Sequence, residues 1–236
     1  MDITALQRRL ADHGYYTGAI DGIYGPKTRA AVLAALTGGP DHRLDASDIE
    51  WAADRLNDHP AKIWAFVDVE ASGRPFIDGR PVILPERHRF SRWTKGRFDK
   101  SHPRLSDPRW DKSWYPKTQA ARYEVLLDWV GLDVDGAFAA CSYGAFQILG
   151  ENHLVCDAPT PWAFAWRQAQ TEGDQLHAFV MFIEGNGLVK ALHQAKANDP
   201  ESCIPLVSRY NGTAFRQNNY HVRFARQIAV RMGQAA

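Results

Sequence analysis

The 236-residue sequence has few cysteines, no long apolar run and almost no net charge. Its apolar stretches fall short of the roughly 18 residues that suggest a membrane-spanning helix. The N-terminal segment MDITALQRRL is polar and amphipathic and has no apolar core like that of a signal peptide. We therefore expect a chain that is made without a conventional export signal. The formal net charge of +1 argues against a nucleic-acid-binding protein, which usually carries a basic face.

Cysteine and histidine are placed in ways that exclude the common metal sites. Cys141, Cys156 and Cys203 are an odd set without metal-ligand spacing, so we interpret them as free thiols in a reducing compartment. The nine histidines are scattered singly, without the H-x-x-E-H cluster or the separated H-x-H pair that a zinc peptidase or amidase would need. We expect no metal and no cofactor.

The chain has room for one medium domain and one small one. Ile3, Leu6 and Leu10 have the spacing of an amphipathic helix, and Pro26 suits the first turn of a second helix. The polar segment TGGPDHRLDAS follows, with Asp45 and Ser47 as candidate N-caps of the next helix. We predict a small domain over 1–38, a linker over 39–46 and a larger domain over 47–236.

The first 35 residues resemble the peptidoglycan-binding module that accompanies many cell-wall hydrolases. The matching positions are Leu6-Gln7, Leu10, Gly14-Tyr15, Asp21-Gly22, Tyr24-Gly25, Thr28 and Ala31. The resemblance implies a three-helix-type unit that binds the wall, and we assign wall binding to Tyr15, Tyr16, Asp21, Tyr24 and Thr28. The alternative is a helical hairpin that only braces the larger domain.

Glu70 is the most informative residue of the larger domain. In a helix over 60–70 it shares one face with Ile63, Phe66 and Val67, so a carboxylate ends an apolar stripe. Burial there disfavours the charged form and raises the carboxyl pKa, as a general acid near neutral pH requires. The alternative is a glutamate that caps the helix or forms a local salt bridge.

The rest of the sequence predicts mostly helix, with a short β element over 83–90 after the Asp78-Gly79 turn. Helical patterns cover residues 47–57, 115–129, 161–171, 174–184, 187–197, 201–210 and 220–232.

Four further segments carry polar groups suited to chemistry. VILPERHRFSRW contains Glu86 and His88, although a salt-bridged strand would explain it equally well. SYGAFQILG (142–150) predicts a Ser/Gly opening after which Phe146 and Gln147 enter a helix. RYNG (209–212) predicts a helix end at a glycine corner, and RWDKSWYP (109–116) predicts a lid or rim.

In this order, these segments resemble the lysozyme superfamily in its goose-type and lytic-transglycosylase branches. Over residues 45–236 the chain is most similar to the N-acetylmuramidase domain of bacteriophage endolysins, although Pro85 replaces the aromatic residue common before E-R-H. The resemblance implies a mainly α, lysozyme-like domain with a short β element. It also implies cleavage of the β-1,4 bond between N-acetylmuramic acid and N-acetylglucosamine, with Glu70 as the catalytic acid. The substrate-binding residues we predict are Ser142, Tyr143, Phe146, Gln147, Tyr210, Asn211 and His88.

The second catalytic group is left open. Asp68 lies about 200° around the helix from Glu70 and cannot flank the same bond. Glu86 is the nearest candidate, as a second carboxylate or a positioning residue, and a bound water is the alternative. The alternatives are that the protein is a lytic transglycosylase or a non-catalytic wall-binding protein. We expect a monomer that binds glycan strands, is made in the host cytoplasm and acts in the periplasm after holin-dependent release.

Overall fold

The computed structural model describes residues 1–38, 43–70, 75–212 and 215–234. Helices dominate and the sheets are small, which confirms the predicted mainly α fold. The helices are α1 (Ile3–Asp12), α2 (Pro26–Ala35), α3 (Ala46–Leu56), α4 (Pro60–Glu70), α5 (Arg87–Trp93), α6 (Gln119–Leu132), α7 (Val134–Ala139), α8 (Pro161–Gln168), α9 (Glu172–Gly185), α10 (Val189–Gln194), α11 (Pro200–Tyr210) and α12 (Tyr220–Arg231). Short 3₁₀ turns cover Lys112–Trp114 and Gly150–Asn152.

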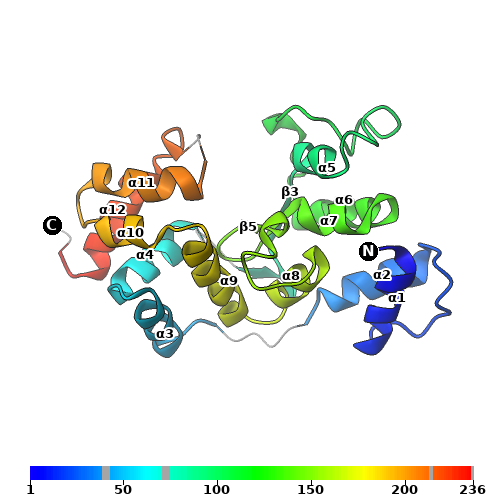
Figure 1. Ribbon diagram of the computed structural model, residues 1–236, viewed down its shortest axis with the longest axis horizontal. Coiled ribbons are helices and arrows are strands. Elements are labelled where there is room, and N and C mark those ends of the chain that lie inside the picture. Colours follow the sequence, from blue (N-terminus) through cyan, green and yellow to red (C-terminus); the bar gives the residue numbers. More distant parts are fainter. Residues whose placement is uncertain (39–42, 71–74, 213–214, 235–236) are drawn as a thin grey trace.

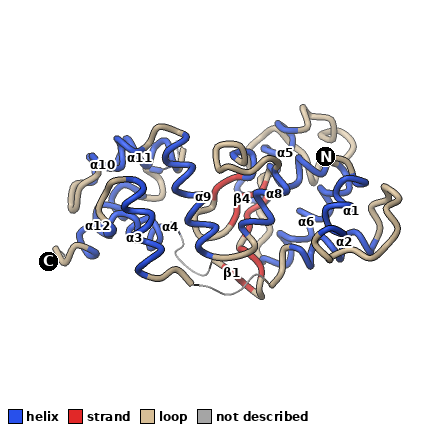
Figure 2. The backbone as a smooth tube through the Cα atoms, turned by 60° about the horizontal axis from the view of Figure 1, so that its bottom comes forward, coloured by secondary structure: helices blue, strands red, loops and turns tan. Residues whose placement is uncertain are grey.

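The molecule is elongated, with the strands near its middle (Figures 1 and 2). One end is formed by α3, α4, α10, α11 and α12, and the other by α5 to α7 together with α1 and α2. Helices α8 and α9 lie between these two ends. No helix among the described residues is long and apolar enough to cross a bilayer.

The helix starts follow the capping signals of the sequence. Pro26 opens α2 as predicted, and the Asp45 carboxylate caps α3 by accepting from the backbone N–H groups of Ser47 (2.8 Å) and Asp48 (3.1 Å). Residues 39–42 of the predicted linker lie outside the described residues. Helix α6 begins at Gln119 rather than at Tyr115, because the Thr118 side chain caps it by accepting from Ala121 N–H at 3.1 Å.

Within the described part of the chain, two antiparallel sheets lie between the helical ends. Strands β1 (Phe76–Ile77) and β2 (Arg80–Pro81) form a hairpin, with Asp78 and Gly79 both at positive φ in its turn. Strands β3 (Ile83–Pro85), β4 (Cys141–Tyr143) and β5 (Ile148–Leu149) form the second sheet in that order. In its register Leu84 faces Ser142.

The β element predicted over 83–90 is too long. The strand ends at Pro85, and Glu86 is the extended N-cap residue of α5. The cause is tertiary packing, since Phe90 is fully buried and its ring stacks on that of Trp129 with centroids 4.7 Å apart. The alternating sequence pattern carried no sign of this long-range contact.

A buried lysine joins α4 to the end of α10. The Lys62 ammonium donates to the Asp58 carboxylate at 3.0 Å and to the carbonyls of Leu192 (2.9 Å) and His193 (3.0 Å). Both charged side chains are more than 90% buried. The pair therefore satisfies carbonyl groups at the C-terminus of α10, which otherwise lack helical partners.

We predict that Lys62→Met destabilises the protein by roughly 3–5 kcal/mol, because it leaves the Asp58 carboxylate buried without its cation. Urea denaturation measures the change in unfolding free energy. Adding Asp58→Asn should recover part of the loss, because the buried charge is then gone. Equal stability of Lys62→Met and wild type would show that the pair contributes nothing.

Candidate active site

Glu70 ends helix α4 on the apolar face that the sequence predicts. Ile63 and Phe66 on this face are buried, and Glu70 itself is partly exposed. Its Oε1 accepts a hydrogen bond from the Asn211 side-chain N–H at 2.7 Å. The residues that follow, 71–74, lie outside the described residues.

The environment of Glu70 raises its pKa to about 7. Burial is the main cause, because it disfavours the charged carboxylate. The hydrogen bond from Asn211 and the positive charge of Arg223 act in the opposite direction, and burial prevails. A carboxyl group with this pKa is partly protonated at neutral pH and can give or take a proton there.

The corner after α11 delivers Asn211 to this carboxyl. Helix α11 ends at Tyr210, and the chain turns at Gly212, whose φ of 70° favours glycine. The Tyr210 hydroxyl donates to the carbonyl of Phe146 at 2.9 Å. The glycine corner predicted for RYNG therefore exists, and it links the end of α4 to the turn between β4 and β5.

The segment SYGAFQILG forms a β-hairpin, and the predicted entry of Phe146 and Gln147 into a helix is wrong. Gly144 and Gln147 both have positive φ, which closes the chain into a turn. The Gln147 amide donates to the Gly144 carbonyl at 2.9 Å and accepts from the Ser142 hydroxyl at 2.9 Å. These local hydrogen bonds compete with a helix and stabilise the turn.

Two of the predicted substrate-binding side chains lie in the core. Tyr143 is fully buried, and its hydroxyl donates to the Phe138 carbonyl at 3.0 Å. Phe146 is 1% exposed, and its ring stacks on that of Phe179 with centroids 4.7 Å apart. We therefore reassign both side chains to packing, and only the backbone of Phe146 takes part in the site.

Glu86 and His88 form a second polar cluster. The Glu86 carboxylate accepts from the Tyr115 hydroxyl at 2.7 Å and lies 3.4 Å from Nδ1 of His88. Tyr115 in turn accepts from the indole N–H of Trp110 at 3.1 Å. Burial raises the pKa of Glu86, against the effect of the Tyr115 hydrogen bond and the Arg89 charge, and burial lowers the pKa of His88.

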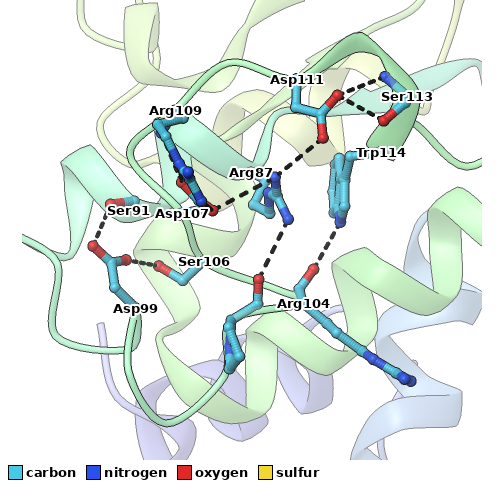
Figure 3. Close-up of polar contacts among 11 residues, drawn as sticks. Arg87, Ser91, Asp99, Arg104, Ser106, Asp107, Arg109, Asp111, Ser113 and Trp114 are labelled. Atoms are coloured by element: carbon cyan, nitrogen blue, oxygen red, sulfur yellow. Dashed lines mark hydrogen bonds and ion pairs between the residues drawn. The ribbon is translucent and has the colours of Figure 1, made fainter.

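Arg87 anchors the loop that carries Asp107, Asp111 and Trp114 (Figure 3). Its guanidinium lies 3.7 Å from the Asp107 carboxylate and 3.8 Å from that of Asp111, and it stands over the Trp114 ring. The Trp114 indole donates to the Arg104 carbonyl at 2.7 Å. The Trp-rich stretch predicted as a lid or rim is thus fastened at several points.

In the small domain, four of the five predicted wall-binding residues make structural contacts. The fully buried Gln7 amide donates to Asp21 Oδ1 (2.9 Å), Thr28 Oγ1 (3.1 Å) and the Tyr16 hydroxyl (3.3 Å). The Tyr24 hydroxyl instead donates to the larger domain, at the carbonyl of Leu127. Tyr15, the fifth, is half-buried.

Sequence reasoning missed Arg223, Tyr220 and Tyr115. Arg223 donates to the Val69 carbonyl at 2.9 Å, and its charge opposes the rise that burial causes in the pKa of Glu70. Burial and, after it, the Glu70 charge raise the pKa of Tyr220. Each of the three acts on a residue far away in the chain, so no local motif marks it. Among the described residues, no group of three or more His, Cys, Asp or Glu side chains could hold a metal ion.

A partly buried carboxyl of raised pKa at the end of a helix, within a mainly α fold, defines a candidate acid–base enzyme. Residues 59–230 match the N-acetylmuramidase family, and residues 2–35 match a family described as a peptidoglycan binding domain. The crystal structure of the Burkholderia AP3 phage endolysin is similar, with a TM-score of 0.71 and 31% sequence identity over 99% of this chain and 95% of that one. The comparison with curated proteins finds no match.

The chain belongs to the N-acetylmuramidase family, whose match covers most of its length. It is a glycoside hydrolase that acts on peptidoglycan. The resemblance read from the sequence is confirmed at this level.

The raised pKa of Glu70 predicts a pH-dependent stability. Below the ordinary value of 4.5 the carboxyl is protonated in both the folded and the unfolded chain, so it has no effect. Between 4.5 and about 7 only the folded chain keeps the proton, so stability falls as pH rises, and the penalty is constant above that range.

Glu70→Gln is always neutral and should escape this penalty. We expect it to gain stability over wild type from pH 4.5 to 7, by at most about 3 kcal/mol. Urea denaturation of both proteins between pH 4 and pH 8 measures the difference, in which other titrating groups cancel. A constant difference across this range would contradict the raised pKa.

Proposed function

We propose that Glu70 is the general acid with which this muramidase cleaves the β-1,4 bond between N-acetylmuramic acid and N-acetylglucosamine. The observation that carries the proposal is the pKa of about 7, caused by burial at the end of α4. The protonated carboxyl would give its proton to the glycosidic oxygen as the bond breaks. Because Oε1 accepts from Asn211, the proton is carried by Oε2.

The second half of the reaction needs a nucleophile or a base on the other side of the bond. We assign this part to a water that donates to the Ser142 hydroxyl, which itself donates to Gln147 and still has lone pairs to accept with. As the water oxygen bonds to the anomeric carbon and the glycosidic bond breaks, the water loses a proton to the solvent, and Glu70 regains its proton from the solvent. Glu86 then serves as a positioning residue that holds Tyr115 and His88. Asn211 donates to Glu70, while Tyr210 and Gln147 donate to backbone carbonyls of the β4–β5 turn and so hold the surrounding chain in place.

The small domain extends this proposal to the whole chain. We propose that residues 1–38 bind peptidoglycan, that residues 39–46 link the two domains, and that residues 47–236 form the catalytic domain. The chain would then act as an endolysin, like the Burkholderia AP3 phage protein of similar structure. In this role it is a monomer made in the host cytoplasm, and it reaches the periplasmic wall after holin-dependent release.

We expect Glu70→Gln to lower activity on purified sacculi by about 10²–10⁴-fold, the usual contribution of general acid–base catalysis. Asp68→Asn is the matched control. It changes a carboxylate on the same helix that pairs with Arg231 at 2.6 Å, and it should stay within a few-fold of wild type. Turbidity loss measures the rate, circular dichroism checks folding, and mass spectrometry should find reducing N-acetylmuramic acid ends.

The wild-type rate should also fall above pH 7, as Glu70 loses its proton. A folded Glu70→Gln protein within a few-fold of wild type would remove Glu70 from the mechanism.

Glu86 is tested by comparing two substitutions. Glu86→Gln keeps an oxygen that can accept from Tyr115, so we expect activity within ten-fold of wild type and little change in stability. Glu86→Ala removes the partner of the Tyr115 hydroxyl and should destabilise the protein by about 1–3 kcal/mol. A hundred-fold loss of activity in Glu86→Gln, at an unchanged melting temperature, would make Glu86 the second catalytic carboxylate instead.

A further inference from the structure

Helix α6 contains a glycine that the helix itself does not require. Gly131 lies in the last turn of α6 and does not have the positive φ of a helix-ending glycine. Glycine at a helical position is less stable than alanine. A Cβ built on Gly131 would lie 2.8 Å from Cδ1 of Tyr24, closer than Cβ atoms approach other atoms in proteins, and at a tight 3.2 Å from Cε1. The missing side chain therefore makes room for the tyrosine ring of the small domain.

The Tyr24 ring is held in this position by its hydroxyl, which donates to the Leu127 carbonyl at 2.8 Å. It cannot move aside for a Cβ without losing or bending this hydrogen bond. Leu127 and Gly131 are four residues apart, so both contacts lie on one face of α6. Tyr24 thus fits one turn of the muramidase helix through both its ring and its hydroxyl.

Arg29 of the small domain binds the same helix. Its guanidinium pairs with Glu124 and, at 2.9 Å, with Asp128, two carboxylates that are one turn apart on α6. Both pairs are partly exposed, so their energetic contribution is small and salt-dependent. These pairs act mainly on orientation, because a planar guanidinium that contacts two carboxylates restrains the rotation of α2 relative to α6.

A third contact lies away from α6. The ring of His13, at the end of α1, stacks on Trp166 of α8 with centroids 4.6 Å apart and an angle of 27° between the planes. The contacts at Tyr24, Arg29 and His13 come from three separate parts of the small domain, namely its loop, its second helix and the end of its first helix. Contacts from three separate parts restrain rotation of this domain on the larger one, and Figures 1 and 2 both draw α1 and α2 beside α6.

We propose that the face of the small domain carrying Tyr24 and Arg29 is a docking surface for α6 of the muramidase domain. The small domain then presents a different face to peptidoglycan and is held at a fixed orientation to Glu70. Tyr24 changes from a predicted wall contact to a docking residue. The effect of this orientation on peptidoglycan cleavage rests on the proposed function, whereas the docking itself does not.

A double-mutant cycle in the full chain tests the docking. Gly131→Ala should lower the melting temperature when Tyr24 is present, because the new methyl group displaces the ring. In a Tyr24→Ala background the same change should raise the melting temperature, since only helix propensity remains. Gly173→Ala, in the first turn of α9 with its nearest neighbour at 3.5 Å, is the control and should have the same effect in both backgrounds. A rise of equal size for Gly131→Ala in both backgrounds would overturn the proposal.

Spin-label distances test the fixed orientation without relying on stability. Cysteines introduced at the exposed positions Arg8 and Glu201 can be labelled selectively, because the three native thiols are buried. We expect one narrow distance distribution for the chain with an intact interface, and a broad one after Gly131→Ala or Arg29→Glu. A broad distribution with the interface intact would refute the docking, whatever the role of Glu70.

Activity on soluble and insoluble substrates tests whether the fixed orientation matters for cleavage of the intact wall. Gly131→Ala, which lies outside the catalytic groups, should turn over short soluble glycans at the wild-type rate and lose several-fold in rate on intact sacculi. An equal loss on both substrates would mean that the interface supports the catalytic domain only, and would overturn the orienting role. Loss of activity on both substrates in Glu70→Gln tests the proposed catalytic acid and has no bearing on the docking.

Discussion

The aromatic cluster around Phe66 is the constraint on which the rest of the structure depends. The Phe66 ring, on α4, meets the rings of Phe179 on α9, Tyr210 on α11 and Phe224 on α12, with centroids 4.5 to 5.2 Å apart. Phe66 also lies one helical turn before Glu70. The same face of α4 therefore carries both the ring that closes the core of this end of the molecule and the carboxyl group whose pKa burial raises. Packing on this face of α4 thus serves both the stability of the fold and the raised pKa of Glu70.

The pKa of Glu70 results from opposing effects, of which burial is the largest. Desolvation favours the protonated carboxyl, while the Asn211 hydrogen bond and the Arg223 charge favour the carboxylate. A hydrogen bond to a charged group contributes about 1.5–3 kcal/mol, comparable with the free energy of a pKa shift of one or two units. The net result near neutrality thus depends on the corner after α11 holding Asn211 in place. Tyr210 does this by joining the packed rings to the Phe146 carbonyl.

How much could be predicted from the sequence depends on where the information lies. Helix α4, the placement of Glu70 at its end and the glycine corner after Tyr210 follow from local periodicity and turn residues, and the structure agrees. The helix at Arg87 and the hairpin at Gln147 were missed, because Phe90 stacks on Trp129 and Gln147 bonds to Val82 and Gly144. The secondary structure of these segments is determined by contacts with residues far away in the chain or by side-chain hydrogen bonds, neither of which appears in the hydrophobic periodicity.

The wall-binding motif shows a different limit of sequence reasoning. Its glutamine, aspartate and threonine are joined to one another through the buried Gln7 amide, so the motif encodes the fold of the small domain and leaves the ligand face undefined.

Helix α6 then relates that domain to the catalytic one. At its start, the Gln119 amide accepts from the Ile83 N–H at 3.0 Å and donates to the Ile83 carbonyl at 3.2 Å, in the strand that leads to Glu86. At its end, Gly131 receives Tyr24. Gln119 and Gly131 are twelve residues apart, which corresponds to roughly 18 Å along the helix at 1.5 Å per residue. In the proposed docked arrangement, one helix therefore sets the distance between the small domain and the β sheet of the catalytic domain.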